Sequence, residues 1–285
     1  MIYLILSIIT SVVVVCFFKL FDKYNVNTLQ AIVVNYIVCG IMGNVMADKP
    51  GILTSFWQEG WFPYTLVLGF LFISVFYSIA QTAQKMGVSA SMVAAKLSVA
   101  IPVTIAIFAQ NEQVNILKIT GIILSMVAVY FISHGAGSSS NKQLWVLPLY
   151  VFIGSGCIDT LLNMIDKNFI PPFDTNHILS FVFLTAFILG TGLMFIQQQK
   201  SKETFQLKSI YWGIALGIPN YLCMLFLLKT LNSFNEASLV LPINNIGIVM
   251  STTLAGLLFF KEKTNLKNWI GLTLAVISIV MLAYN

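Results

Sequence analysis

Two ionisable side chains, Lys96 and Asp159, stand inside long apolar runs of the sequence. If those runs cross a membrane, each charge costs at least about 2.5–3.5 kcal/mol in the hydrocarbon, so its presence indicates a functional site. In that interpretation Lys96 binds an anionic group such as a carboxylate, and Asp159 binds a ligand or carries a coupling proton. The alternatives are that the two residues pair as a structural bridge, that Lys96 extends to a membrane surface, and that Asp159 joins neighbouring helices.

Amide and phenol side chains mark further polar positions in the apolar runs. Asn163 lies one helical turn after Asp159 and shares its face of the helix. Asn244 and Asn245 follow Pro242, whose missing N–H favours a break in that helix. Polar groups at a broken helix are typical of transport sites, and hydrogen bonding between helices is the open alternative. Asn35 is expected to face neighbouring helices. The candidate binding residues are therefore Lys96, Asp159, Asn163, Tyr77, Gln81, Asn220, Tyr221, Asn244 and Asn245.

The composition places these residues in a membrane protein. Hydrophobic residues make up 58% of the 285 residues and charged residues 9%, whereas soluble domains carry about 25% charged residues. The apolar runs are continuous rather than alternating, which favours helices over a β-barrel. Ten runs have the length of about 20 residues that a spanning helix needs. They cover residues 2–20, 28–46, 62–84, 89–110, 115–134, 144–165, 176–197, 209–229, 237–259 and 267–284.

Several classes of chemistry find no support in the sequence. All fifteen basic residues are lysines without a basic run, which argues against nucleic-acid binding. The four cysteines lie in apolar runs without metal-ligand spacing, so we expect neither a metal nor a cofactor. His134 and His177 lie near the ends of spans, and no motif of a hydrolase or metalloprotease is present. We therefore expect that the protein is not an enzyme. A lipid-modifying membrane enzyme and a non-transporting membrane subunit are the alternative interpretations.

The two halves of the chain resemble each other. Residues 90–93 read ASMV at the start of the fourth span, and residues 237–240 read ASLV at the start of the ninth. Glu112 lies in the loop before the fifth span, and Gly121 lies nine residues later within that span. Glu262 and Gly271 have the same spacing and the same places at the tenth span. A tandem repeat of five spans must enter the membrane in opposite directions, because five is odd. The sequence thus predicts an all-α membrane protein of two inverted five-helix repeats, residues 1–135 and 144–285, joined by a linker at 136–143.

This layout resembles the drug/metabolite transporter superfamily in its ten-helix form, which is built from two EamA-like repeats. The resemblance rests on Pro102, Glu112 and Gly121 in the first half and on Pro242, Glu262 and Gly271 in the second. Pro242 departs from the pattern, because it lies twenty residues before its glutamate whereas Pro102 lies ten before its own. We interpret the two glutamates and the two prolines as structural or gating residues.

The resemblance implies a secondary transporter, often an exporter, that binds a small metabolite in a central cavity and works by alternating access. The expected location is the cytoplasmic membrane of the cell, with the lipid bilayer, a small-molecule substrate and a coupling proton as partners. A monomer or a homodimer fits this interpretation. The resemblance implies cytoplasmic termini, whereas the excess of lysines in loops after odd-numbered spans would place both termini outside.

Overall fold

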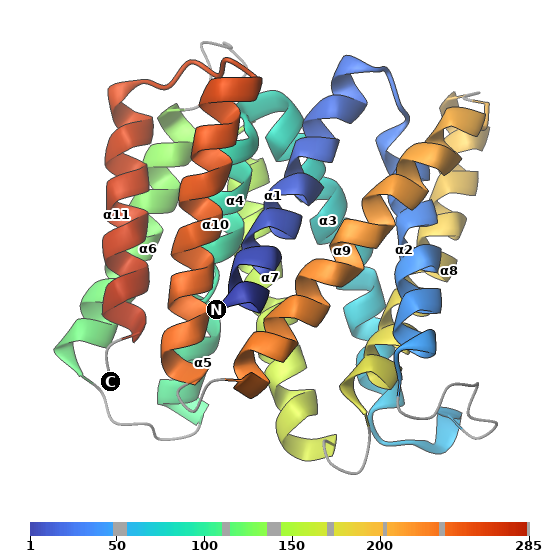
Figure 1. Cartoon of the computed structure of the whole chain (residues 1–285), viewed down its shortest axis with the longest axis horizontal. Coiled ribbons are helices and arrows are strands. Elements are labelled where there is room, and N and C mark those ends of the chain that lie inside the picture. The colour runs from blue at the N-terminus through green and yellow to red at the C-terminus, as the bar shows by residue number, and fades with distance from the viewer. Residues whose placement is uncertain are drawn as a thin grey trace. The chain divides into compact units, whose positions relative to one another are not determined.

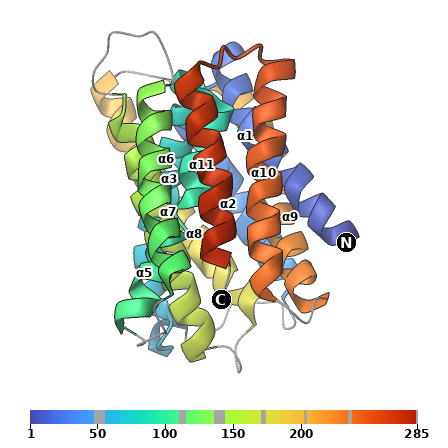
Figure 2. The ribbon, with the colours of Figure 1, turned by 90° about the vertical axis from the view of Figure 1, so that its left-hand side faces the viewer.

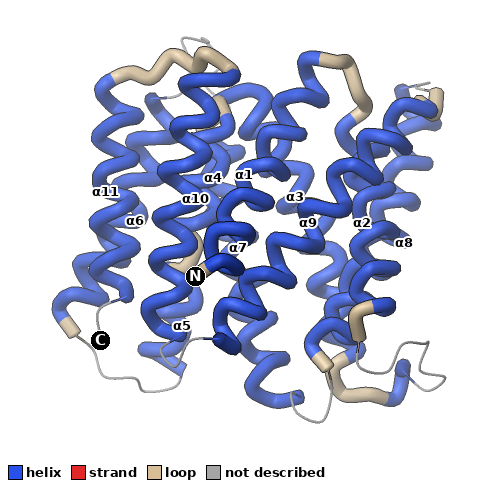
Figure 3. Tube along the Cα trace, viewed as in Figure 1, coloured by secondary structure: helices blue, strands red, loops and turns tan. Residues whose placement is uncertain are grey.

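The computed structural model describes residues 1–47, 56–109, 115–135, 144–169, 174–201, 204–233 and 237–283. Every regular element in these ranges is helical (Figure 3). The predicted linker at 136–143 and Glu112 lie outside the described residues. The α-helices are α1 Ile2–Lys23, α2 Thr28–Val45, α3 Phe62–Met86, α4 Val88–Leu97, α5 Ala100–Ala109, α6 Ile116–Gly135, α7 Val146–Phe169, α8 Thr175–Ser201, α9 Leu207–Ser233, α10 Ala237–Phe259 and α11 Leu266–Ala283, with a short 3-10 helix at Phe56–Gln58.

The predicted membrane spans are confirmed. Ten helical stretches are long and apolar enough to cross a membrane, with α4 and α5 together forming one of them, Val88–Phe108. Each predicted span coincides with one of these stretches. Helices satisfy their own backbone hydrogen bonds, which hydrocarbon cannot do for them. The apolar runs therefore fix both the type and the number of the elements.

The fourth span is broken at Ser98 and Val99, between α4 and α5. Pro102 causes the break, because a proline has no N–H and its ring collides with the carbonyl of the residue four positions earlier, here Ser98. The helix restarts at Ala100, so Pro102 falls in the first turn of α5. A backbone N–H in the first turn of a helix has no partner within that helix, so the N–H that Pro102 lacks costs little.

The break predicted after Pro242 is not observed. Helix α10 runs without interruption from Ala237 to Phe259, with Pro242 inside it. Pro242 lies in the second turn, so it removes one hydrogen bond near the N-terminal end without dividing the helix. The prediction was therefore wrong about which span breaks: the fourth span breaks at its proline, and the ninth span does not.

Helices α6 and α11, the fifth spans of the two predicted halves, pack side by side (Figures 1 and 2). Gly121 near the start of α6 lies against Leu282 at the end of α11, and Gly271 near the start of α11 lies against Ile132 at the end of α6. The Ser278 hydroxyl also donates a hydrogen bond of 2.8 Å to the Gly121 carbonyl. These contacts make the pair antiparallel and reciprocal.

Helices α2 and α8, the second spans of the two halves, repeat this arrangement. Gly40 lies against Leu184, Gly190 lies against Val33, and the Ser180 hydroxyl donates to the Gly40 carbonyl over 2.7 Å. Small residues let two helices approach closely, and this packing is a main source of association in lipid. Antiparallel packing of equivalent spans is the arrangement that an inverted repeat requires. It supports the inverted topology, which stays a prediction.

The chain divides into two compact units that do not follow the predicted halves. The first unit contains Met1–Leu20, Ser78–Thr160 and Leu222–Asn285, and the second contains Phe21–Tyr77 and Leu161–Tyr221. Each unit takes segments from both halves of the chain. The pairing of equivalent helices explains this division, because α6 and α11 belong to the first unit whereas α2 and α8 belong to the second.

We predict that Gly271→Val destabilises the protein, because the Cβ of a new side chain would lie 2.6 Å from Ile132 Cγ1. Overpacking of this kind costs about 1–3 kcal/mol. Thermal unfolding of the detergent-solubilised protein measures the loss. Gly192→Val in α8 is the matched control, because among the described residues no atom beyond the adjoining turns of its own helix lies within 4 Å of a Cβ placed there. Equal melting of the two variants would contradict the close packing of α6 against α11.

Candidate functional site

Lys96 is the penultimate residue of α4 and lies next to the break in the fourth span. Its side chain is half-buried. A cation is favourable at the C-terminus of a helix, where the last carbonyl groups carry partial negative charge. The break therefore gives Lys96 a helix end in the middle of a membrane-spanning stretch.

Ser98 occupies the break and connects it to α7. Its hydroxyl lies 2.6 Å from the carbonyl of Ala95 and 3.2 Å from Oδ2 of Asp159, and both oxygens accept from it. One carboxylate oxygen of Asp159 thus faces the end of α4. The polar atoms that the break releases are partly satisfied by these side chains.

Asp159 remains exposed although it accepts the hydrogen bond from Ser98. The ammonium group of Lys96 acts on this carboxylate electrostatically. Both residues belong to the described part of the chain, and no direct ion pair joins them there. The carboxylate and the ammonium group therefore retain the capacity to bind other groups.

A close helix contact holds α7 in this position. A Cβ added at Gly156 would collide with Ile101 of α5, so the two helices approach each other closely at this point. Thr160, one turn later, donates to the Gly156 carbonyl over 2.8 Å. Asp159 lies between these two residues and shares their fixed backbone.

Cys223 of α9 is within electrostatic range of Lys96. The charge of Lys96 acts on its thiol, which also interacts with the side chain of Ser11 in α1. The Ser7 hydroxyl donates to the Cys223 carbonyl over 3.1 Å. Cys223 thus connects two serines of α1 with the electrostatic range of Lys96 in α4.

The sequence interpretation did not assign Ser98, Cys223 or Ser11 to the site. The signal for Ser98 was its position four residues before Pro102, where a proline displaces the carbonyl and the helix ends. Ser11 and Cys223 carried no such signal, since small polar residues are common in membrane helices.

Asn220 and Tyr221 take part in hydrogen bonds between helices of the second unit. Nδ2 of Asn220 donates to Oδ1 of Asn35 over 3.0 Å, and the Tyr221 hydroxyl donates to Oδ1 of Asn176 over 3.2 Å. Asn35 is fully buried, and the prediction that it faces neighbouring helices is confirmed. These contacts favour a structural role for Asn220 and Tyr221.

The remaining candidates differ in their surroundings. Asn244 is 1% exposed, and its Oδ1 has no hydrogen-bond partner among the residues that the structure describes. Asn245 and Tyr77 are half-buried, and Asn163 is exposed on α7. Gln81 is half-buried, and its amide donates to Oε1 of Gln84 over 3.4 Å. None of these residues shares a hydrogen bond with Lys96 or Asp159 in the described part of the chain, so their binding roles stay predictions.

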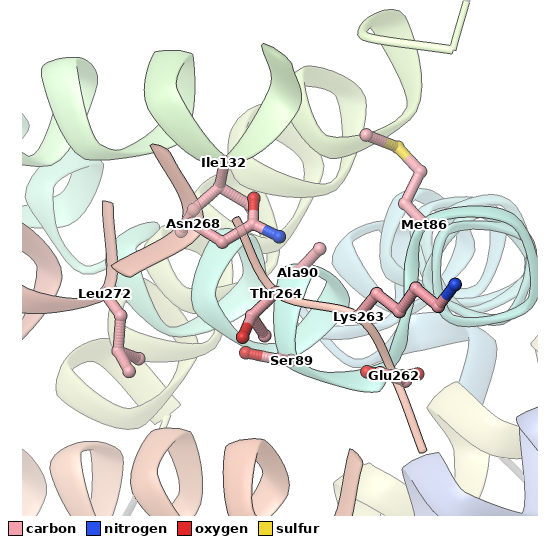
Figure 4. Close-up of a pocket in the computed structure, with 9 residues that line it drawn as sticks. All are labelled: Met86, Ser89, Ala90, Ile132, Glu262, Lys263, Thr264, Asn268 and Leu272. Atoms are coloured by element: carbon pink, nitrogen blue, oxygen red, sulfur yellow. The ribbon is translucent and has the colours of Figure 1, made fainter. Parts of the chain in front are cut away.

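Glu262 lies in the loop between α10 and α11, at the N-terminal end of α4. A shallow depression beside it is also lined by Ser89, Lys263, Thr264 and Asn268 (Figure 4). Its carboxylate accepts a hydrogen bond of 2.9 Å from the backbone N–H of Val88. Within the described residues, no group of three or more His, Cys, Asp and Glu side chains is placed to hold a metal ion.

The helices and the charged residues define a multi-pass membrane protein with polar groups inside a membrane-spanning bundle. Residues 148–284 match the EamA-like transporter family. This match and the ten membrane-length helices confirm the predicted resemblance to EamA-like proteins of the drug/metabolite transporter superfamily. The match indicates a membrane transporter of that type, and the expectation that the protein is not an enzyme stays a prediction.

Two further comparisons cover nearly the whole chain. An uncharacterized protein of Haemophilus influenzae is 29% identical over an alignment 290 residues long, which covers 99% of this chain and 97% of that protein. A solved crystal structure has a TM-score of 0.58 at 13% identity, covering 97% of this chain and 96% of its own. At that identity the second comparison shows a shared fold.

We predict that Cys223 reacts faster with an anionic than with a cationic methanethiosulfonate, because the positive charge of Lys96 acts on its thiol. The expected preference is about 3-fold to 10-fold, since two unit charges a few Å apart in water interact by about 1 kcal/mol. Labelling rates are measured in a variant with Cys16, Cys39 and Cys157 replaced by alanine. Lys96→Gln should remove the preference. If the Lys96→Gln variant kept the same preference for the anionic reagent, the charge of Lys96 would not be what acts on Cys223.

Proposed function

We propose that this protein is a secondary active transporter that exports a small metabolite across the cytoplasmic membrane. The observation that carries the proposal is the arrangement of Lys96 and Asp159. The two opposite charges lie at one break in a membrane-spanning helix and act on each other, and among the described residues no direct ion pair joins them. Charges at membrane depth face water or a partner rather than lipid, and they mark substrate and ion pathways.

The chemistry of the two groups suggests their roles. The ammonium group of Lys96 would bind an anionic group of the substrate, such as a carboxylate, because it is a strong donor with three N–H bonds. Asp159, which is exposed, would bind a cationic or hydrogen-bonding group or carry the coupling proton. A substrate that occupies both groups replaces the water that each would otherwise need.

The finer parts of the proposal follow from the family resemblance. Substrate would enter a central cavity, and the two repeats would expose it alternately to the two sides of the membrane. A proton is the proposed coupling ion, and the functional unit is a monomer or a homodimer in the lipid bilayer. No nucleic acid takes part.

A thermal-shift screen of metabolites against the detergent-solubilised protein is the first test, because a ligand stabilises the folded state by about 2.7 kcal/mol at 100 times its Kd. A metabolite that stabilises the protein is then tested in liposomes with and without a proton gradient. Transport that requires the gradient supports the proposal. Liposomes that move no stabilising metabolite under either condition would count against it.

We predict that Lys96→Ala and Asp159→Asn each abolish transport of that metabolite and its stabilising effect, while insertion and thermal unfolding without ligand stay close to the wild type. Each substitution removes a charge that binds the substrate or couples its movement. Lys267→Ala is the matched control, since Lys267 is an exposed lysine in the first turn of α11. Normal binding and transport by both site variants would show that the site lies elsewhere.

A further inference from the structure

The N-terminal end of α4 depends on a side chain from a distant part of the chain. Gly87, the residue before α4, has a φ of 107° and supplies no side-chain cap. Glu262 supplies the cap instead, because its Oε1 accepts a hydrogen bond of 2.9 Å from the N–H of Val88. A carboxylate at this position satisfies a free N–H of the first turn and is also favoured by the helix dipole.

The carboxylate of Glu262 is tightly enclosed. A Cβ added at Gly87 would lie 2.7 Å from its Oε2, and one added at Gly256 would lie 2.5 Å from the same atom. The φ of Lys261, 51°, turns the chain after α10, and the N–H of Glu262 donates to the Gly256 carbonyl over 3.0 Å. The glutamate is thus fixed through both its backbone and its side chain.

Lys19 connects the same junction to α1 and α3. Its Nζ lies 3.9 Å from Oε1 of Glu262, and the side chains of Lys19 and Glu262 are 24% and 14% exposed. Nζ also donates to the carbonyls of Ala83 and Gln84 at the end of α3, over 3.3 Å and 2.9 Å. Lys19 therefore binds the C-terminal end of α3 beside the point where Glu262 binds the N-terminal end of α4.

Helix α4 is consequently held at both ends by side chains from other segments. Glu262 holds the first residue, Val88, and Asp159 accepts from Ser98, directly after the last residue. Lys96 lies eight residues after Val88, about 12 Å along the helix axis. A helix of this length is rigid over such a distance, so a displacement of its N-terminal end moves Lys96 as well.

We propose that Glu262 is a positioning residue for Lys96 and acts through α4. The inference rests on the proposed function, since it assigns Glu262 a part in the binding role of Lys96. The carboxylate fixes where α4 begins, and the ten residues of the helix then place the ammonium group relative to Asp159. Substrate affinity therefore depends on a residue that does not touch substrate.

The test compares Glu262→Ala with Glu262→Gln in the variant that retains only Cys223. The alanine variant loses the acceptor for the Val88 N–H, whereas the glutamine variant keeps an oxygen at that position. We expect Glu262→Ala to reduce the preference of Cys223 for the anionic methanethiosulfonate from about 3-fold to 10-fold toward none, as Lys96→Gln does. Glu262→Gln should retain most of it. Lys263→Ala, in the same loop, is the control and should retain all of it.

A second variant keeps the proposal falsifiable if Glu262→Ala does not fold. Gly256→Ala leaves Glu262 in place but displaces its carboxylate, and it should reduce the preference of Cys223 in the same direction. An unchanged preference in folded Glu262→Ala, or in Gly256→Ala when Glu262→Ala does not fold, would overturn the proposal. So would a loss in Glu262→Gln as large as the loss in Glu262→Ala.

Transport measurements separate this proposal from the proposed function. If Lys96 binds substrate, Glu262→Ala should raise KM with a smaller change in the maximal rate. In a Lys96 variant whose transport is reduced but measurable, such as Lys96→Gln, Glu262→Ala should have no further effect on KM. Additive effects of the two substitutions on KM would overturn the positioning role. Normal transport by Lys96→Ala would instead overturn the proposed function, while a changed labelling preference at Cys223 would still support the link from Glu262 to Lys96.

Discussion

A backbone N–H or carbonyl group that enters hydrocarbon without a partner costs several kcal/mol, and the main features of this protein follow from that cost. The ten spanning stretches are helical because a helix pairs these groups within one segment. The fourth span is the exception, since Pro102 prevents a continuous helix. The backbone groups that the break leaves without helical partners then need polar partners inside the bundle. Ser98 and Asp159 lie where such partners are needed.

Lipid provides no hydrophobic driving force between helices, so the packing within each unit relies on close approach. Glycines supply it, and they do so in reciprocal pairs. Gly121 and Gly271 each face a branched side chain of the opposite helix, and Gly40 and Gly190 do the same in the second unit. The same antiparallel scheme in two separate helix pairs agrees with an origin of the two halves from one five-helix unit.

Four charged residues of the first unit lie near the two ends of one short helix. Glu262 and Lys19 lie at the N-terminal end of α4, and Lys96 and Asp159 lie near its C-terminal end. At the N-terminal end Glu262 and Lys19 bind backbone groups, and at the C-terminal end Asp159 accepts from the Ser98 hydroxyl. A break in a helix thus serves two purposes, because it admits charged groups to the bundle and orients them.

The sequence by itself determined the membrane class, the ten spans, the family resemblance and the two charges within membrane-spanning stretches. These features depend on composition and on runs of neighbouring residues, which act through local physics. It failed at the break expected after Pro242, because the effect of a proline depends on where the helix around it begins. Only the tertiary structure decided that Ser98 bonds to Asp159, that Asn220 bonds to Asn35, and that Glu262 caps α4. Those contacts join residues 61 to 185 positions apart, and their partners are chosen by packing between helices rather than by any local pattern.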